Sequence, residues 1–249
     1  MKRFEGKAIL VTGAGSGIGK ATALRFGEEG GHVLCGDING GPAEETAAAI
    51  RQAGGQAASL VCDVANPEQV KALVAGAVER YGRLDVVVNV AGVGGFKRTT
   101  DVTLEEWNRY IGINLTGTFM MCQQAIPHIL KSEGAIINVA SVAGLKSHPY
   151  SAAYCASKGG VVMMTRALAV EYGRKGVRIN AICPGGIETP LISQFQLPEG
   201  VSPQVLMRIS PLGRMGKPAE IAGTIAFLAS PDATYINGAA IVVDGGMIT

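Results

Sequence analysis

The sequence predicts an α/β fold, a doubly wound parallel sheet of about seven strands with helices on both faces. Short runs rich in Val and Ile alternate along the chain with longer amphipathic segments, which is the pattern of successive strand and helix units. The short runs lack polar alternation, as expected for parallel strands buried on both faces. A chain of 249 residues suits one large domain, and we expect residues 1–249 to form one.

The elements follow in order from the N-terminus. The first predicted strand, 8–12, runs into a glycine turn and a helical pattern. Further apolar runs predict strands at 32–37, 57–64, 84–92, 134–141, 177–185 and 239–246. Helices are predicted over Pro67–Tyr81, Leu104–Lys131 and Ala152–Tyr172. The alternation breaks at 184–218, where six prolines interrupt apolar residues.

Composition favours small-molecule chemistry. Charged residues make up 17% of the chain and the net charge is +2, so nothing marks a surface for nucleic acid or an anionic membrane. No apolar run reaches the length of a membrane span or a secretion signal. The five cysteines are scattered without metal-ligand spacing. We therefore expect free thiols, no metal site and a soluble protein of the cytoplasm.

The turn after the first strand, TGAGSGIG (12–19), indicates a nucleotide site. Gly13, Gly17 and Gly19 let the backbone approach a pyrophosphate closely. The helix that starts there offers unpaired amides and the positive end of its dipole to an anion. A tight turn without a ligand is the alternative. Its place in the first strand and helix unit favours the dinucleotide site of a Rossmann-type fold.

Motifs in the order of one family cover nearly the whole chain. They are TGAGSGIG (12–19), CDV (62–64), NVAG (89–92), Asn114, Ser141, YCASK (154–158), PGGIET (184–189) and VDGG (243–246). The chain therefore resembles the short-chain dehydrogenase/reductase family. It departs from the family pattern at Val90, where a second Asn is usual. Asn89 and Gly92 remain, so we expect this wall of the nucleotide site to be kept.

The resemblance implies four catalytic residues, Asn114, Ser141, Tyr154 and Lys158. Tyr154 would be the general acid/base toward a substrate hydroxyl or carbonyl group. In a helix Lys158 lies on the same face, and its ammonium would lower the phenol pKa from about 10. Ser141 would hydrogen-bond the substrate oxygen. Asn114 would hold a water that links Lys158 to solvent, and the simpler alternative is a buried Asn bonded to backbone carbonyls.

The end of the second strand bears on the choice of cofactor. Asp37 stands where an acidic residue accepts hydrogen bonds from the ribose hydroxyls and repels a 2′-phosphate. Ile38 and Ser16 stand where relatives that bind NADP usually carry a basic residue. We therefore expect NAD, with a turn-forming Asp as the alternative for Asp37. The residues expected around the cofactor are Gly13, Ser16, Gly17, Ile18, Gly19, Asp37, Ile38, Asp63, Val64, Asn89, Ala91, Gly92, Tyr154, Lys158, Pro184, Gly185, Ile187 and Thr189.

Residues 185–218 resemble the family's substrate lid. Seven large apolar residues give this segment too much apolar surface to stay solvated, namely Leu191, Ile192, Phe195, Leu197, Val205, Leu206 and Met207. We expect it to close over nicotinamide and substrate, with Val93, Phe96 and Leu145 on the opposite wall. Such a pocket favours a neutral secondary alcohol or its ketone. The cations that could reach into it are Lys97, Arg98, Lys146 and Arg208.

The sequence thus predicts an NAD-dependent oxidoreductase for a small-molecule secondary alcohol or ketone. One alternative is a reductase of 3-oxoacyl thioesters on a carrier protein, disfavoured because Ser132 and Glu133 stand where such enzymes often have a basic residue. The other is a non-catalytic dinucleotide-binding regulator, disfavoured because all four catalytic residues are present. The family usually pairs its two long helices across a two-fold axis, so we also expect a homotetramer.

Overall fold

Seven parallel strands form one sheet in the part of the chain that the computed structural model describes, residues 2–202 and 211–248. Their order is β3-β2-β1-β4-β5-β6-β7, which confirms the predicted doubly wound α/β fold. The strands are β1 (Ala8–Thr12), β2 (His32–Asp37), β3 (Gln56–Val61), β4 (Val86–Asn89), β5 (Ala135–Val139), β6 (Arg178–Pro184) and β7 (Ala240–Val243). The α-helices are α1 (Gly17–Glu28), α2 (Gly40–Gln52), α3 (Pro67–Tyr81), α4 (Leu104–Tyr110), α5 (Gly117–Ser132), α6 (Ala152–Tyr172) and α7 (Pro218–Ala229).

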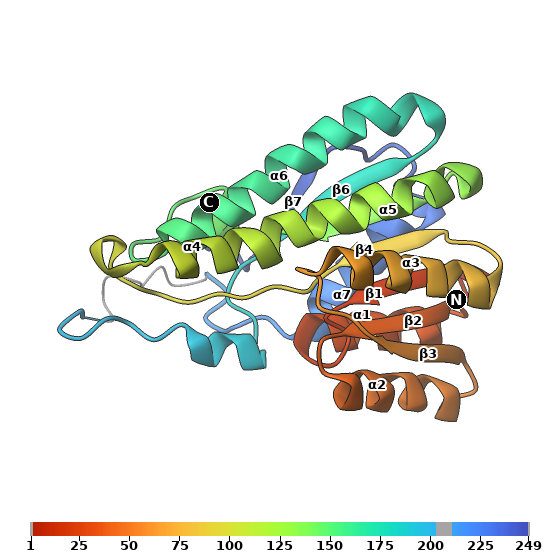
Figure 1. The fold of residues 1–249 in the computed structure, drawn as a ribbon, viewed down its shortest axis with the longest axis horizontal. Coiled ribbons are helices and arrows are strands. Elements are labelled where there is room, and N and C mark those ends of the chain that lie inside the picture. Colours follow the sequence, from red (N-terminus) through yellow and green to blue (C-terminus); the bar gives the residue numbers. More distant parts are fainter. Residues whose placement is uncertain (1, 203–210, 249) are drawn as a thin grey trace.

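Helices cover both faces of the sheet (Figure 1). Along β1, Ile9 and Val11 face the core under α1, α2 and α7, while Leu10 faces the core under α3, α5 and α6. Successive side chains of a strand point to opposite faces, so two apolar layers require an unbroken apolar run. This is why the strands showed no polar alternation in the sequence.

β1 and β2 end where predicted, whereas the other five strands end one to three residues earlier. β4 ends at Asn89, although its apolar run continues to 92. Beyond that point the amides of Val90 and Ala91 donate to the side-chain hydroxyl of Thr12, at 3.0 and 3.2 Å, and not to a backbone carbonyl of β1. The sheet order also reverses at this place, since β2 lies on one side of β1 and β4 on the other. Such a reversal opens a crevice at the carboxyl edge of a parallel sheet.

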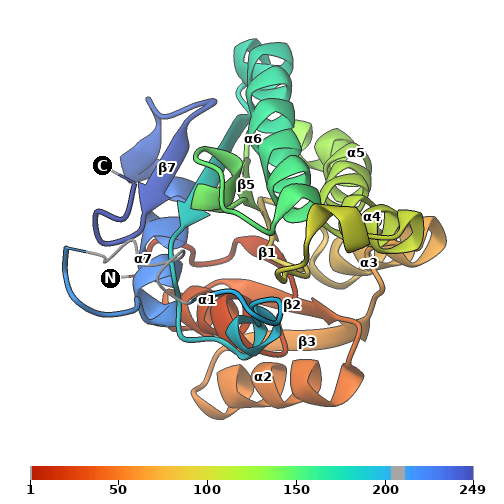
Figure 2. The same cartoon turned by 90° about the vertical axis from the view of Figure 1, so that its left-hand side faces the viewer.

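The segment after β6 returns to this crevice. A short helix, η5 (Pro190–Gln194), follows β6 and lies next to the start of α1 (Figure 2). The two touch closely, because a Cβ added at Gly17 would lie 3.0 Å from Cγ2 of Thr189. The chain after β6 therefore borders the crevice.

The helix predicted over Leu104–Lys131 is interrupted, which corrects the prediction. A turn of π-helix, η2 (Ile111–Thr116), separates α4 from α5 and contains the fully buried Asn114. Nδ2 of Asn114 donates to the Val93 carbonyl at 2.9 Å, and its Oδ1 accepts from the Val93 amide at 2.8 Å. A π-helical turn is often found at functional sites. The apolar periodicity of a helix does not reveal one extra residue in a turn, so the sequence predicted a continuous helix.

Three expectations concerned the cysteines, membrane spans and metal ligands. All five cysteines are free thiols, and only Cys155 is partly exposed. Within residues 2–202 and 211–248, no helix has the length and apolar character needed to cross a membrane. The same residues contain no group of three or more His, Cys, Asp or Glu side chains able to hold a metal ion.

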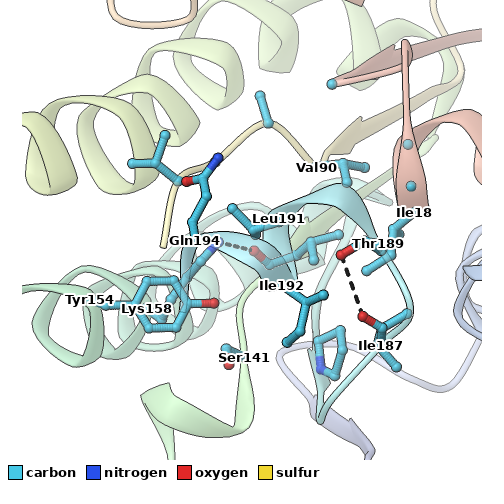
Figure 3. Close-up of a pocket in the computed structure, with 18 of the residues that line it drawn as sticks. Ile18, Val90, Ser141, Tyr154, Lys158, Ile187, Thr189, Leu191, Ile192 and Gln194 are labelled. Atoms are coloured by element: carbon cyan, nitrogen blue, oxygen red, sulfur yellow. Dashed lines mark hydrogen bonds between the residues drawn. The ribbon is translucent and has the colours of Figure 1, made fainter. Parts of the chain in front are cut away.

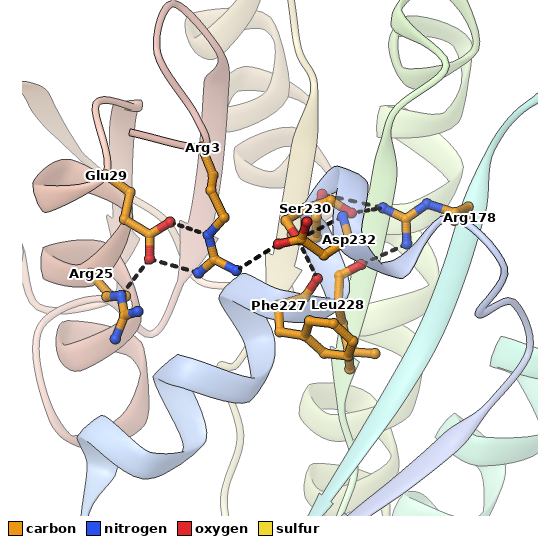
Figure 4. A network of polar contacts seen from close by, with 9 residues as sticks. Arg3, Arg25, Glu29, Arg178, Phe227, Leu228, Ser230 and Asp232 are labelled. Carbon is orange, nitrogen blue, oxygen red and sulfur yellow. Dashed lines mark hydrogen bonds and ion pairs between the residues drawn. The ribbon is translucent and has the colours of Figure 1, made fainter. Parts of the chain in front are cut away.

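Arginines join the N-terminal segment and β6 to the end of α7 (Figure 4). Arg3 lies between Glu29, with Nε and Oε2 2.6 Å apart, and Asp232, with Nη1 and Oδ2 3.5 Å apart. At the start of β6, the Arg178 guanidinium donates to four backbone carbonyls, those of Leu228, Ala229, Ser230 and Ala233, at 2.6 to 3.2 Å. The last carbonyls of a helix lack partners within the helix, so Arg178 caps α7.

Arg178→Met should lower the free energy of unfolding by about 3 kcal/mol, because several carbonyl groups lose a charged donor. Denaturant unfolding measures this difference. Arg80→Met, on an exposed part of α3, removes an arginine without such contacts and should leave the stability unchanged. Equal stability of Arg178→Met and the wild type would contradict the capping role.

Candidate active site

A pocket of about 810 Å³ opens at the carboxyl edge of the sheet (Figure 3). It brings together all the predicted site residues except Asn89 and Asn114. The predicted residues that line it are Gly13, Ser16, Gly17, Ile18, Gly19, Asp37, Ile38, Asp63, Val64, Ala91, Gly92, Ser141, Tyr154, Lys158, Pro184, Gly185, Ile187 and Thr189. Residues far apart in the sequence thus share one cavity, as the carboxyl ends of parallel strands allow.

The turn from β1 to α1 has a shape that only glycine permits. A Cβ at Gly19 would overlap the carbonyl oxygen of Gly13. Gly13 itself has φ +65°, and a Cβ there would lie 3.0 Å from the backbone of Ala91. The N-cap residue of α1, Ser16, makes no side-chain capping bond, which leaves the first amides of the helix to an anion. This cradle fits the pyrophosphate of a dinucleotide.

Asp37 ends β2 beside that cradle. Its Oδ2 accepts from the Gly15 amide and its Oδ1 from the Asn39 amide, both at 2.9 Å. The bond to Asn39 is the turn-forming role that the sequence left open. The bond to Gly15 and the place on the pocket wall go beyond that role, because they fix the carboxylate beside the phosphate cradle. Each carboxylate oxygen keeps acceptor capacity for a ribose hydroxyl.

Asn89 lies behind the pocket wall and does not take its predicted place in it. Its Nδ2 donates to Oδ1 of Asn138 on β5 at 2.8 Å, and Nδ2 of Asn138 donates to Oγ1 of Thr165 on α6 at 2.9 Å. The Oδ1 of Asn89 is buried and has no partner among the described residues. The side chain at the end of β4 faces the helix layer, so Val90 and the residues after it form the wall instead.

Tyr154 and Lys158 lie one turn apart on α6 and both border the pocket. They are 8% and 5% exposed, so each is almost fully desolvated. Nζ of Lys158 donates to the carbonyl of Val139, at the end of β5, at 2.8 Å. Figure 3 shows the Tyr154 ring and Lys158 beside Ser141, which follows the same strand. The strand and the helix therefore bring the three polar groups to one corner of the pocket.

Asn114 lies next to this corner but does not line the pocket. Its Nδ2 donates to the Ser157 hydroxyl at 3.0 Å, and that hydroxyl donates to the Tyr154 carbonyl at 2.8 Å. A Cβ at Gly92 would lie 3.0 Å from Oδ1 of Asn114 and 3.4 Å from Nζ of Lys158, so both groups border the same small space. The bonds to the Val93 backbone show that Asn114 also has the simpler structural role left open by the sequence.

Burial is the largest influence on the pKa values of Tyr154 and Lys158. Burial raises the pKa of Tyr154 to about 12, against a hydrogen bond with Ser141 that lowers it. Burial also lowers the pKa of Lys158 to about 8. Desolvation is the largest influence on the phenol, and Lys158 is not among the groups that shift its pKa here, so the lowering of that pKa by Lys158 stays a prediction for the complex with cofactor.

Residues outside the family motifs also line the pocket. They are Val93, Phe96, Arg109, Ile113, His148, Ser151, Leu191, Ile192, Gln194, Phe195 and Met247, with others next to the motifs. The hydroxyl of Ser151 is buried and has no partner among the described residues. Leu145, predicted on the wall with Val93 and Phe96, is exposed and lies outside the pocket, since it follows the short helix η3 (Val142–Gly144) on the solvent side. No family motif pointed to Ser151 or Arg109.

The predicted apolar character of the substrate region holds for most of its wall. Lys97 pairs with Glu106, and Nη2 of Arg98 donates to the Glu199 carbonyl at 2.9 Å, so both cations are engaged outside the pocket. Lys146 does not line it either, whereas Arg109 does. Leu197 lies outside the pocket, and Val205, Leu206, Met207 and Arg208 lie outside the described residues.

The chain is similar over nearly its whole length to known reductases and dehydrogenases. A family model described as enoyl-(acyl carrier protein) reductase matches residues 13–248. The chain is 41% identical over 247 residues to a 3-oxoacyl-(acyl-carrier-protein) reductase of Thermotoga maritima, covering 99% of each chain. It is 42% identical over 245 residues to a cyclohexanol dehydrogenase of an Acinetobacter species, covering 98% of this chain and 95% of that protein. The crystal structure of a 3-ketoacyl-(acyl-carrier-protein) reductase from Brucella melitensis complexed with NADH matches with a TM-score of 0.90 at 37% identity, covering 98% of this chain and 99% of that one.

The lowered pKa of Lys158 predicts a dependence of stability on pH. Between its folded pKa of about 8 and its ordinary value of 10.5, the unfolded chain binds more protons than the folded one. Stability must then rise with pH through this window, and the penalty for burying the ammonium is fully present only below it. Lys158→Met lacks this contribution. In thermal unfolding of ligand-free protein, the wild type should gain stability relative to Lys158→Met from pH 8 to 10, and a constant difference would contradict the buried ammonium.

Proposed function

Because the chain belongs to the short-chain dehydrogenase/reductase family and is an oxidoreductase acting on CH–OH groups, we propose that its substrate is a neutral secondary alcohol or the corresponding ketone, with NAD as cofactor. The observation that carries this proposal is the meeting of Ser141, Tyr154 and Lys158 at one corner of a mostly apolar pocket. A nicotinamide dinucleotide supplies the hydride acceptor or donor. The chain's own residues supply binding, orientation and the movement of the proton.

Tyr154 is proposed to exchange the proton at the substrate oxygen. With a pKa of about 12 it is protonated at neutral pH, which is the form that can donate a proton to a ketone. Alcohol oxidation needs the phenolate, so Lys158 and the positive charge of an oxidised nicotinamide must lower that pKa in the complex. Ser141 hydrogen-bonds the same substrate oxygen and stabilises the charge that develops on it.

Asn114 is proposed to complete a proton path from Lys158. Its Oδ1 and the ammonium of Lys158 both border the space beside Gly92, which suits one bridging water. The π-helical turn supports this role, because it sets Asn114 against the loop after β4 and not along a regular helix face. In this way the ammonium can recover a proton while Tyr154 remains covered.

The choice of NAD over NADP rests on Asp37. Its two backbone hydrogen bonds hold the carboxylate at the end of β2, where it can accept from ribose hydroxyls and repel a phosphate. Ile38 beside it offers no positive charge. The similar Brucella reductase was crystallised with NADH, which agrees with this choice.

Residues 185–218 are proposed to act as a lid within a single domain formed by residues 1–249. Leu191, Ile192 and Phe195 already contribute apolar surface to the pocket. Closure over the substrate would exclude water from the reacting atoms and strengthen the hydrogen bonds made there.

Reduction of a 3-oxoacyl thioester is the second candidate, favoured by the Thermotoga and Brucella relatives. Arg109 on the pocket wall is a cation available to such a substrate. The place of Glu133 at the end of α5 argues against an acidic carrier protein there. A kcat/KM for an acetoacetyl thioester above that for every simple ketone would favour this candidate.

A homotetramer is proposed from the outer face of α4, α5 and α6. Five large apolar side chains are exposed there, among them Leu104 at 73% and Val170 at 84%. The others are Trp107, Phe119 and Met163. An exposed apolar face of this kind favours an interface, and pairing of the long helices across a two-fold axis would cover it.

Tyr154→Phe should reduce turnover on the order of a hundredfold or more, because the general acid/base is removed. Binding of NAD, followed by fluorescence titration, should stay close to that of the wild type. Lys158→Met should impair both turnover and cofactor binding. Undiminished turnover of Tyr154→Phe would overturn the assignment, and binding of NAD without turnover of any alcohol by the wild type would favour a dinucleotide-binding regulator.

Asp37→Ala combined with Ile38→Arg should raise the ratio of kcat/KM for NADP to that for NAD by about a hundredfold, since a repulsive carboxylate is replaced by a cation near the phosphate. Ile38→Arg alone is the matched control. It keeps Asp37 and should shift the ratio much less. A wild type that uses NADP as efficiently as NAD would show that Asp37 does not select the cofactor.

A further inference from the structure

An aromatic side chain of the proposed lid packs against Tyr154. Phe195 directly follows η5, and its ring meets the Tyr154 ring with centroids 5.4 Å apart and planes at 80°. The same ring meets Phe96, on the loop after β4, at 5.1 Å and 77°. Edge-to-face contacts at these separations are favourable. Three rings therefore run from the loop after β4, through the lid segment, to the catalytic helix.

A pair of glycines makes room for this ring. A Cβ at Gly94 would overlap Cζ of Phe195 and would lie 2.6 Å from its Cε2. A Cβ at Gly95 would lie 3.2 Å from the carbonyl oxygen of Gln194, the residue before Phe195. Neither glycine has a positive φ, so backbone conformation does not require glycine at these positions. The requirement is one of space, and we call the hollow formed by Gly94 and Gly95 the glycine notch.

A hydrogen bond holds the segment that follows. Nη2 of Arg98 donates to the Glu199 carbonyl at 2.9 Å, so the loop after β4 contacts the lid segment on both sides of Leu197. Phe195 also lines the pocket, together with Phe96. The ring beside Tyr154 is thus seated on the backbone of Gly94 and cannot be regarded as an exposed loop side chain.

We propose that Phe195, seated in the glycine notch, determines substrate specificity by forming with Phe96 an aromatic wall that favours ring-containing neutral alcohols and ketones over linear ones of equal size. The inference rests on the proposed function, since it takes Tyr154 as the group that meets the substrate oxygen. A ring-shaped substrate buries its C–H groups against the two phenyl rings without losing internal rotations. A linear chain of the same size must order several bonds to make the same contacts.

The specificity test compares cyclohexanol with 2-hexanol, which have the same number of carbons, using NAD and steady-state kinetics. Phe195→Ala should lower the ratio of kcat/KM for cyclohexanol to that for 2-hexanol by about tenfold, and Phe195→Leu by less. Gly94→Ala should lower the ratio similarly, because its methyl group displaces the ring. Gly41→Ala is the matched control, since a Cβ at Gly41 meets nothing within 4 Å.

The glycine notch is tested separately from turnover. Hydrogen exchange of residues 190–202 in the ligand-free protein should be faster in Gly94→Ala and Phe195→Ala than in the wild type and Gly41→Ala. Equal exchange rates in all four proteins would contradict the proposal that the glycine notch holds Phe195.

The kinetic results distinguish failure of the specificity proposal from failure of the proposed function. If Phe195→Ala raises kcat/KM for both alcohols equally, Phe195 only obstructs the site and the specificity proposal fails while the proposed function stands. If the wild type turns over neither these alcohols nor other neutral ones, the proposed function fails, and the specificity proposal fails with it.

Discussion

Burial of the sheet on both faces is the constraint on which the rest of the structure depends. A strand such as β1 sends Leu10 into one core and Ile9 and Val11 into the other, so no face of the sheet is left for water. The sheet therefore presents polar side chains to a ligand only at its strand ends, and α6 adds Tyr154 and Lys158 from the side. Asp37 at the end of β2 and Ser141 just after β5 stand at such ends, and both line the pocket. The position of the site follows from the same burial that stabilises the fold.

Most of the fold and much of the site follow from short-range signals in the sequence. Pro67–Tyr81 was predicted to the residue, because Asn66 caps the helix and Gly82 ends it in the left-handed conformation. The glycines of the first turn were recognisable because close approach of backbone to backbone excludes any side chain, as the overlap of a Cβ at Gly19 with Gly13 shows. Such constraints act within a few residues, and a sequence displays them directly.

The predictions that did not hold depend on contacts between distant residues. The π-helical turn contains Asn114, whose side chain bonds Val93 and Ser157, and neither of these is near it in the chain. Asn89 faces away from the pocket because its side chain donates to Asn138 on the neighbouring strand β5. The raised pKa of Tyr154 comes from burial by elements distant in the sequence, which the spacing of Tyr154 and Lys158 does not reveal. Phe195 was expected in a lid, but its seat on Gly94 could not be read from either segment alone.

The backbone amides of Val90 and Ala91 donate to the Thr12 hydroxyl, so the pocket wall is held here through its main chain and not through its side chains. Since a main-chain group is held at position 90, the wall keeps its course whatever side chain that residue carries. Val90 nevertheless lines the pocket, so an exchange there alters the surface that a ligand meets. At position 90 the main chain thus supports the wall while the side chain contributes only to its surface.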